Sequence, residues 1–245
     1  MDKLVYTAAA GMKGRMAAQA AIANNIANAN TTGFRAERVN FDALVIQGAG
    51  FDTRQPSSEE VTDLDRRAGA IVQTARPLDV ALPGDAWLTV QASDGSEAYT
   101  RRGDLQIAPS GVLQTGDGYA VMGSGGPITL PPAKSVAIAE DGTISIVPSS
   151  GGAAQAIDKL KLVSAKGTDT VKGLDNLLHV RGGGRLPEDL TAKVESGALE
   201  QSNVNLTQSL VDMIENQRGY EVQAQLLKQA KDLDESSAAV MRLPS

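Results

Sequence analysis

The sequence predicts an α+β protein in which long N- and C-terminal α-helices flank a central all-β domain. At both ends, apolar residues recur at steps of three and four, which is typical of one face of a helix. From Ala70 to about Val180 the period falls to two, and short runs of Val, Ile, Leu and Thr alternate with turn dipeptides. Such short strands with frequent turns favour a sandwich or barrel over a nucleotide-binding βαβ fold.

The N-terminal helix is predicted over Lys3 to Ala29. Its end is expected between Asn28 and Thr32, because Asn competes for backbone hydrogen bonds and tolerates the left-handed conformation. Two interpretations of the Asn-rich segment stay open: a polar cap before a turn at Gly33, or a face that packs against other subunits. The apolar stripe of this helix consists of Leu4, Ala8, Met12, Met16, Ile22 and Ile26.

The C-terminal helix is predicted over Leu206 to Val240, a rod of roughly 50 Å. Asn205 is the expected N-cap with Gln208 as its capping-box partner, and Pro244 closes the far end. A rod this long needs a neighbour, and the N-terminal helix is the natural candidate. Its stripe consists of Leu206, Leu210, Met213, Ile214, Tyr220, Ala224, Leu227 and Leu233.

Glycine interrupts both predicted helices. A glycine inside a helix lowers the stability of that helix by up to about 1 kcal/mol relative to alanine, so these glycines need an explanation. Local weakness is one interpretation. We favour close approach of packed helices, because glycine lacks the side chain that would keep a neighbour away. The positions concerned are Gly11, Gly14 and Gly219.

The middle of the chain divides into a connector, a β-rich domain and a second connector. Turn dipeptides such as Asp94-Gly95 and Asp141-Gly142 predict hairpins with type I′ turns. His179 stands among apolar residues and is interpreted as a strand residue, not a catalytic base. The expected boundaries are 1–34 for the first helix, 35–69 for an extended connector, 70–184 for the β-rich domain, 185–204 for a connector and 205–245 for the last helix.

Composition excludes several function classes. The chain has 23 basic and 29 acidic residues, hence a net charge of −6, with no basic block of the kind that nucleic acid requires. It has no cysteine and one histidine, which removes the usual metal ligands and the commonest general base. We therefore expect no catalytic residue, metal or cofactor. No apolar run approaches the roughly 20 residues of a membrane span, and Met1 to Lys13 lacks the features of a cleaved secretory signal.

Two segments carry a resemblance to a known family. The run ANNIANANTTGF, from Ala23 to Phe34, resembles the signature of the bacterial flagellar axial proteins of the rod and hook. The segment Ser202 to Asn205, with the following Met213, Ile214, Gln217, Arg218 and Tyr220, resembles the C-terminal half of that signature. The opening MDKLVYTAAAGM and the overall length resemble the proximal rod members more than the distal rod or hook members, and the distal rod is the nearest alternative.

The resemblance implies a structural subunit of the flagellar basal-body rod. Its terminal helices would form a coiled-coil-like axial core that transmits torque, with the β-rich domain outside. Its partners would be copies of itself, neighbouring proximal and distal rod subunits, and the export apparatus. It would cross the periplasm in the rod after export without a cleaved signal peptide. The interface residues we predict are Leu4, Met12, Ile22, Asn25, Ile26, Asn28, Asn30, Leu206, Leu210, Met213, Ile214, Tyr220 and Leu227.

Function classes other than a rod subunit are also open. A hook-type axial subunit would carry the same helical ends. A secreted β-domain that binds carbohydrate would need exposed aromatic platforms, and the chain has only one Trp, four Tyr and three Phe. A hydrolase would need a polar constellation at a defined spacing, which the sequence does not offer.

Overall fold

A computed structural model of the chain describes residues 2–43 and 57–241, and it confirms the α+β class. The chain divides into two compact units. The helical unit consists of the described parts of Met1–Ala27, Glu37–Asp63 and Asn205–Ser245. The β-rich unit consists of Asn28–Ala36 and Leu64–Val204. Each unit is therefore assembled from segments that lie far apart in the sequence.

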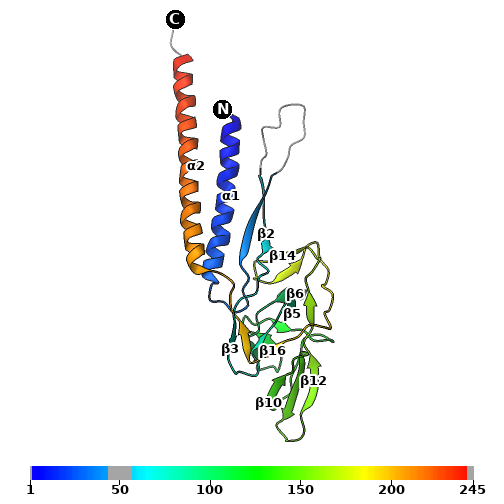
Figure 1. Ribbon diagram of the computed structural model, residues 1–245. Helices are drawn as coiled ribbons and strands as arrows, with labels where there is room; N and C mark the ends of the chain where they lie inside the picture. Colours follow the sequence, from blue (N-terminus) through cyan, green and yellow to red (C-terminus); the bar gives the residue numbers. More distant parts are fainter. Residues whose placement is uncertain (1, 44–56, 242–245) are drawn as a thin grey trace. The chain divides into compact units, whose positions relative to one another are not determined.

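Two helices lie side by side in the helical unit (Figure 1): α1 (Asp2–Ala27) and α2 (Leu206–Met241). The N-cap of α2 is confirmed, because Asn205 Oδ1 accepts a hydrogen bond of 3.0 Å from the Gln208 amide. The other half of the capping box is wrong: the Gln208 side chain donates to Asp212 instead, at 2.8 Å. Pro244 lies outside the described residues. The helix α1 ends slightly earlier than predicted, in a turn where the Thr31 amide donates to the Asn28 carbonyl at 3.0 Å.

A two-stranded sheet accompanies the helices. Its strands are β1 (Glu37–Ala43) and β2 (Ser57–Leu64), which pair with each other. Our sequence analysis expected only an extended connector here. The sequence analysis missed these strands because it relied on alternating apolar residues. The strand β2 reads Ser-Ser-Glu-Glu-Val-Thr-Asp-Leu and has only two apolar residues.

The β-rich unit contains antiparallel sheets. The largest has the order β14-β15-β6-β5-β9-β8-β7 with β13 added beside β5, and a second sheet has the order β10-β11-β12. Two further sheets have two strands each, β16-β4 and β17-β3. In each of them a strand from the C-terminal part of the unit pairs with a strand from its N-terminal part. The strands are β3 (Ile71–Gln73), β4 (Val80–Ala81), β5 (Ala86–Gln91), β6 (Glu97–Thr100), β7 (Leu105–Ile107), β8 (Leu113–Thr115), β9 (Ala120–Val121), β10 (Ala133–Ile138), β11 (Thr143–Pro148), β12 (Gln155–Lys159), β13 (Leu162–Ser164), β14 (Thr170–Lys172), β15 (Leu178–Val180), β16 (Glu195–Ser196) and β17 (Ala198–Glu200).

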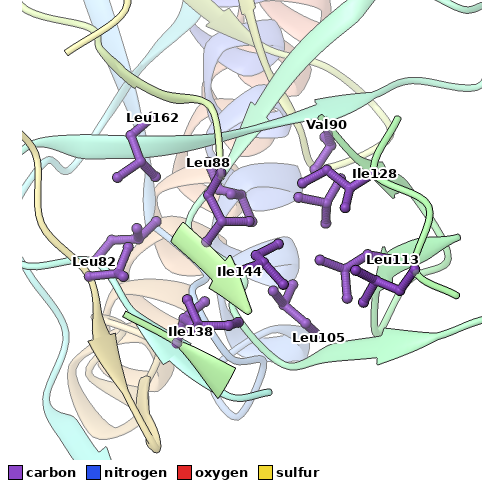
Figure 2. Close-up of a cluster of buried hydrophobic side chains, with 14 of the residues drawn as sticks. Leu82, Leu88, Val90, Leu105, Leu113, Ile128, Ile138, Ile144 and Leu162 are labelled. Atoms are coloured by element: carbon purple, nitrogen blue, oxygen red, sulfur yellow. The ribbon is translucent and has the colours of Figure 1, made fainter. Parts of the chain in front are cut away.

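The core of the β-rich unit is aliphatic. Side chains from several strands and loops point toward one another in Figure 2, and most of those labelled are at most 5% exposed. A smaller cluster around Trp87 and Tyr99 lies beside it, where the Tyr99 hydroxyl accepts a hydrogen bond from the Leu186 amide at 2.7 Å. His179 lies in β15, as predicted. The labelled core residues are Leu82, Leu88, Val90, Leu105, Leu113, Ile128, Ile138, Ile144 and Leu162.

The hairpin turns differ from the predicted type. Gly95 and Gly142 both have φ of 84°, but neither preceding aspartate has a positive φ, which a type I′ turn requires. The Gly95 amide donates to the Ala92 carbonyl at 3.0 Å, so the connection is a type I turn followed by a left-handed glycine. The hairpins are therefore confirmed and the type I′ turn is wrong, because a dipeptide does not distinguish a two-residue loop from a three-residue loop.

A buried charge cluster, the arginine triad, lies at one side of the β-rich unit. Glu200 Oε1 contacts Arg35 Nη2 at 2.6 Å, and Glu200 Oε2 contacts Arg101 Nη2 at 2.6 Å. All three side chains are at most 3% exposed. Arg101 also donates to the carbonyls of Gly84 and Ala86, at 2.9 and 2.5 Å. Glu200 thus joins a residue close to α1 in sequence with Arg101, the residue that directly follows β6.

The side-chain amide of Asn203 bonds two backbone segments, one at Ala36 and one at Asp65 to Arg67. Its Nδ2 donates to the carbonyls of Asp65 and Arg67 at 2.9 and 2.8 Å. Its Oδ1 accepts from the Ala36 amide at 2.7 Å. Since these bonds replace backbone partners that a strand would otherwise supply, they hold the segments near both ends of the unit together.

The burial of the core predicts that alanine substitutions at two isoleucines of one sheet lower the free energy of unfolding by different amounts. Ile144 in β11 is fully buried, whereas Ile157 in the neighbouring β12 is 38% exposed. Replacing Ile144 by Ala should lower the free energy of unfolding by about 2–5 kcal/mol, because it removes buried methyl groups and leaves a cavity. Ile157→Ala should cost less than about 1 kcal/mol. Denaturant unfolding of the full chain measures both, and equal losses would contradict this core.

The triad predicts a large effect of a nearly isosteric change. Glu200→Gln should lower the free energy of unfolding by about 3–5 kcal/mol, because it leaves two buried guanidinium groups without their carboxylate. Glu140→Gln is the matched control, since Glu140 is exposed and its contact with Lys193 is 3.8 Å. Chemical denaturation should show almost no change for the control. A Glu200 variant as stable as the wild type would refute a stabilising role for the triad.

Candidate assembly interface

The seam between α1 and α2 alternates polar or small side chains with larger apolar ones. On α2 seven of the buried or half-buried residues recur at alternating steps of four and three residues, and Asp212, Gly219 and Ala224 beside them are half-buried as well. Only Asn216 and Ala230 among them are less than 10% exposed. The helices therefore pair without a continuous apolar core. We call these residues the seam: Ser209, Met213, Asn216, Tyr220, Gln223, Leu227 and Ala230.

Asn216 bonds α2 to α1. Its Nδ2 donates to the Arg15 carbonyl and to Gln19 Oε1, both at 2.8 Å. A longer contact of 3.5 Å joins Arg15 Nη1 to Asn216 Oδ1. A polar side chain that finds partners at only one position along a helix pair fixes the register of that pair. Asn216 is thus the residue that sets how far α2 is advanced along α1.

The helical glycines lie under side chains of the opposite helix. A Cβ on Gly219 would lie 2.2 Å from Arg15 Cζ, and a Cβ on Gly11 would lie 2.7 Å from Gln223 Nε2. Distances this short are absent from real contacts, so a larger residue would displace these long side chains. The groups over Gly11 and Gly219 are the ends of long side chains and not helix backbone, so the close approach of packed helices stays a prediction.

The large apolar side chains of α2 are mostly exposed. Seven of them are between 44% and 58% exposed, and Met16 on α1 is 61% exposed. A row of this kind on a helix indicates a surface that another molecule covers. We call these α2 residues the exposed stripe: Leu206, Leu210, Val211, Ile214, Val222, Leu226 and Leu233.

The structure divides the predicted interface residues of α2 between two surfaces. Leu206, Leu210 and Ile214 belong to the exposed stripe. Met213, Tyr220 and Leu227 are half-buried in the seam. The sequence analysis described them as one face, because steps of three and four cover a wide arc when the partner helix is unknown. It also missed Val211, Val222 and Leu226, which complete the stripe.

On α1, the predicted residues Met12, Ile22 and Ile26 are half-buried. Leu4 lies within α1, but its side chain is outside the described part of the chain. That these residues take part in assembly stays a prediction, because the structure of a single chain gives their exposure but contains no neighbouring subunit.

The Asn-rich signature has a role inside the chain. Asn25 is buried; its Nδ2 donates to the Glu37 carbonyl at 2.9 Å, and its Oδ1 accepts from the Glu37 amide at 2.8 Å. Asn24 Nδ2 donates to Glu37 Oε1 at 2.6 Å. Asn25 therefore fixes the start of β1 as a neighbouring strand would. Asn28 is half-buried beside Thr31, and Asn30 is exposed.

A cavity of about 260 Å³ opens on the seam beside Asn216. Met16 and Tyr220 line it together with polar side chains of both helices. Its size suits a single side chain better than a drug-sized ligand, for which sites measure roughly 300–1,000 Å³. The helical unit therefore has a cavity on the seam and large exposed apolar side chains on α2.

Two further searches cover the described residues alone. Neither α1 nor α2 is apolar enough over a sufficient length to cross a membrane. In the same part of the chain, no group of three or more His, Asp or Glu side chains is placed to hold a metal ion.

Comparison with known proteins gives matches at both ends and in the middle. Residues 5–35 match the family described as flagella basal body rod protein. Residues 81–146 match the flagellar hook protein FlgE/F/G D1 domain, and residues 195–240 match the C-terminal part of the flagellar basal body rod FlgEFG proteins. The three matches follow one another in the order of the chain.

Individual relatives cover nearly the whole chain. FlgF of Salmonella typhimurium is 38% identical, over 100% of this chain and 99% of its own. FlgF of Escherichia coli is 38% identical over 95% of each chain, and FlgG of Bacillus subtilis is 33% identical over 95% of this chain and 97% of its own. The chain therefore belongs to the family of flagellar basal-body rod proteins, within which it is FlgF-like.

Proposed function

We propose that this rod subunit builds the proximal part of the basal-body rod and joins its neighbours through α1 and α2. In the assembled rod these helices would form a coiled-coil-like axial core that transmits torque. The observation that carries the proposal is the exposed stripe of α2, whose residues are between 44% and 58% exposed. Fully burying one such side chain stabilises by about 1.5–3 kcal/mol, so a neighbouring subunit that covers the stripe gains substantially.

The composition of the seam is a second argument for the proposal. The seam contains Ser209, Asn216 and Gln223, and its larger apolar side chains are only half-buried, so pairing of α1 with α2 leaves apolar surface uncovered. Two helices that pair weakly and leave their large apolar groups in water are incomplete as a monomer. Contacts that repeat from one subunit to the next without closing produce a helical filament, which is the form a rod requires.

The proposed partners are copies of this chain and the neighbouring proximal and distal rod subunits. The flagellar export apparatus would deliver the chain without a cleaved signal peptide, and the rod would carry it across the periplasm. A distal, FlgG-like position is the second candidate, supported by 33% identity to FlgG of Bacillus subtilis. Identity of 38% to FlgF from two organisms favours the proximal position. We propose a mechanical role without catalysis.

A charge placed on the exposed stripe should block assembly. Ile214→Asp puts a carboxylate where a neighbour would bury an apolar side chain, at a cost of several kcal/mol to the contact. We expect loss of swimming and of incorporation into basal bodies when the variant replaces the wild-type chain, with a normal circular dichroism spectrum. Leu210→Asp should behave alike.

The control for these variants is Gln225→Asp, which adds the same charge at an exposed polar position of α2. It should assemble and support motility, because no apolar contact is lost. Normal incorporation of both Ile214→Asp and Leu210→Asp would show that the stripe is not an interface.

The seam predicts opposite effects on stability and on assembly. Asn216→Leu should strengthen the pairing of α1 and α2, because an apolar side chain suits a seam position, but it removes the bonds to Arg15 and Gln19 that set the register. We expect a higher melting temperature of the helical signal and reduced incorporation into rods. Ser209→Leu, at a seam position away from these bonds, should stabilise without impairing assembly. An Asn216 variant that incorporates normally would contradict this role.

A further inference from the structure

A cavity of about 270 Å³ opens beside the arginine triad. Its charged lining consists of Arg35, Arg66, Arg101, Lys166 and Asp85, and Trp87 supplies an apolar wall. All of these residues lie in the β-rich unit, so the cavity is a feature of that unit alone. Its lining includes no described residue of α1, of α2 or of the exposed stripe.

The cavity is positively charged. Four cationic side chains and one carboxylate line it. Glu200 bonds both Arg35 and Arg101, and counting it leaves an excess of two positive charges. The whole chain has a net charge of −6, so the local sign is opposite to the overall one. A concave surface of one sign concentrates ions of the other sign.

The charge inside the triad is incompletely balanced. Arg35 and Arg101 share the single carboxylate of Glu200, and among the described residues nothing bonds Arg35 Nε. Burial, and next the charge of Arg101, lower the pKa of Arg35. The carboxylates of Glu200, Asp65 and Asp85 offset this lowering of the pKa only in part. A buried cation without full compensation is costly, and an anion in the adjoining cavity would offset that cost.

The more exposed side of the cavity has cations that can reach a ligand. Arg66 Nη1 contacts only the Ala165 carbonyl, at 3.5 Å, and no carboxylate of the described residues pairs with its guanidinium. Lys166 Nζ contacts Asp85 Oδ2 at 2.9 Å, but its side chain is 74% exposed. These two groups can therefore bind an incoming anion without disturbing the buried triad.

We propose that this cavity is a binding site for a carboxylate or phosphate group. The planar fork of arginine matches both groups through paired hydrogen bonds, and Lys166 adds a point charge. The volume lies below that of sites for drug-sized ligands, which favours one anionic group with few attached atoms. That group comes from a free ion or from an acidic side chain of a neighbouring subunit.

Calorimetric titration of the full chain with inorganic phosphate and with citrate, at constant ionic strength, tests the site. We expect saturable binding at roughly millimolar concentration. Arg66→Gln and Lys166→Gln should each weaken it about three- to tenfold, because each removes one charged partner. Lys193→Gln is the matched control: Lys193 is an exposed lysine of the same unit that also faces a carboxylate, and its variant should bind like the wild type.

Two results would overturn the proposal. One is the absence of saturable binding of both anions to the wild-type chain. The other is equal binding by the wild type, Arg66→Gln and Lys166→Gln, which would place any bound anion elsewhere. Neither result bears on the rod assignment, because neither variant changes the helices.

With binding established, the double variant Arg66→Gln, Lys166→Gln separates the two sources of the anion. Loss of rod incorporation by a normally folded double variant would assign the site to an acidic side chain of a neighbouring subunit. Normal incorporation together with lost citrate and phosphate binding would assign it to a free ion. This arm rests on the proposed function, and Ile214→Asp tests that function independently.

Discussion

The arginine triad is the constraint on which the β-rich unit depends. Glu200 contacts Arg35 and Arg101 at 2.6 Å from its two oxygens. Arg35 follows the N-terminal signature, Glu200 precedes α2, and Arg101 belongs to the central part of the chain. Since an isolated buried charge is strongly unfavourable, the three segments must come together or all remain in water. The triad thereby couples the folding of the β-rich unit to the placement of the segments that lead to both helices.

Near the triad, an asparagine side chain forms hydrogen bonds with backbone groups that have no neighbouring strand. Asn203 bonds the backbone of Asp65, Arg67 and Ala36. In the helical unit, Asn25 bonds both backbone groups of Glu37 in the same manner. An Asn side chain offers one donor group and one acceptor in the arrangement of a peptide unit, so it can satisfy a backbone segment that has no neighbouring strand. The Asn-rich signatures are therefore local connectors as well as marks of the family.

The helical unit distributes its apolar residues in an unusual way. A stable helix hairpin would place its leucines and isoleucines between the helices, yet here the seam contains Asn216 and Gln223, whereas Leu210 and Ile214 are exposed. The polar seam fixes register at the expense of pairing strength. The exposed stripe leaves large apolar side chains of α2 in water, where burial by another molecule would be favourable. This distribution is the reason for proposing that the helices gain stability when the subunit assembles.

The sequence by itself determined the α+β class, both helices, the N-cap at Asn205 and the β-structure between Ala70 and about Val180, because periodicity and turn dipeptides are local signals. It did not reveal β1 and β2, whose residues carry little apolar alternation, or the three-residue loops at Gly95 and Gly142. Only the tertiary structure decided that Met213, Tyr220 and Leu227 lie in the seam while Leu206, Leu210 and Ile214 are exposed. It also joined Glu200 to Arg101 and Arg35, which precede it by about 100 and 165 positions in the chain. The physical reason is that a helix stripe or a charged residue acquires its role from the partner it meets, and long-range partners leave no pattern in one chain.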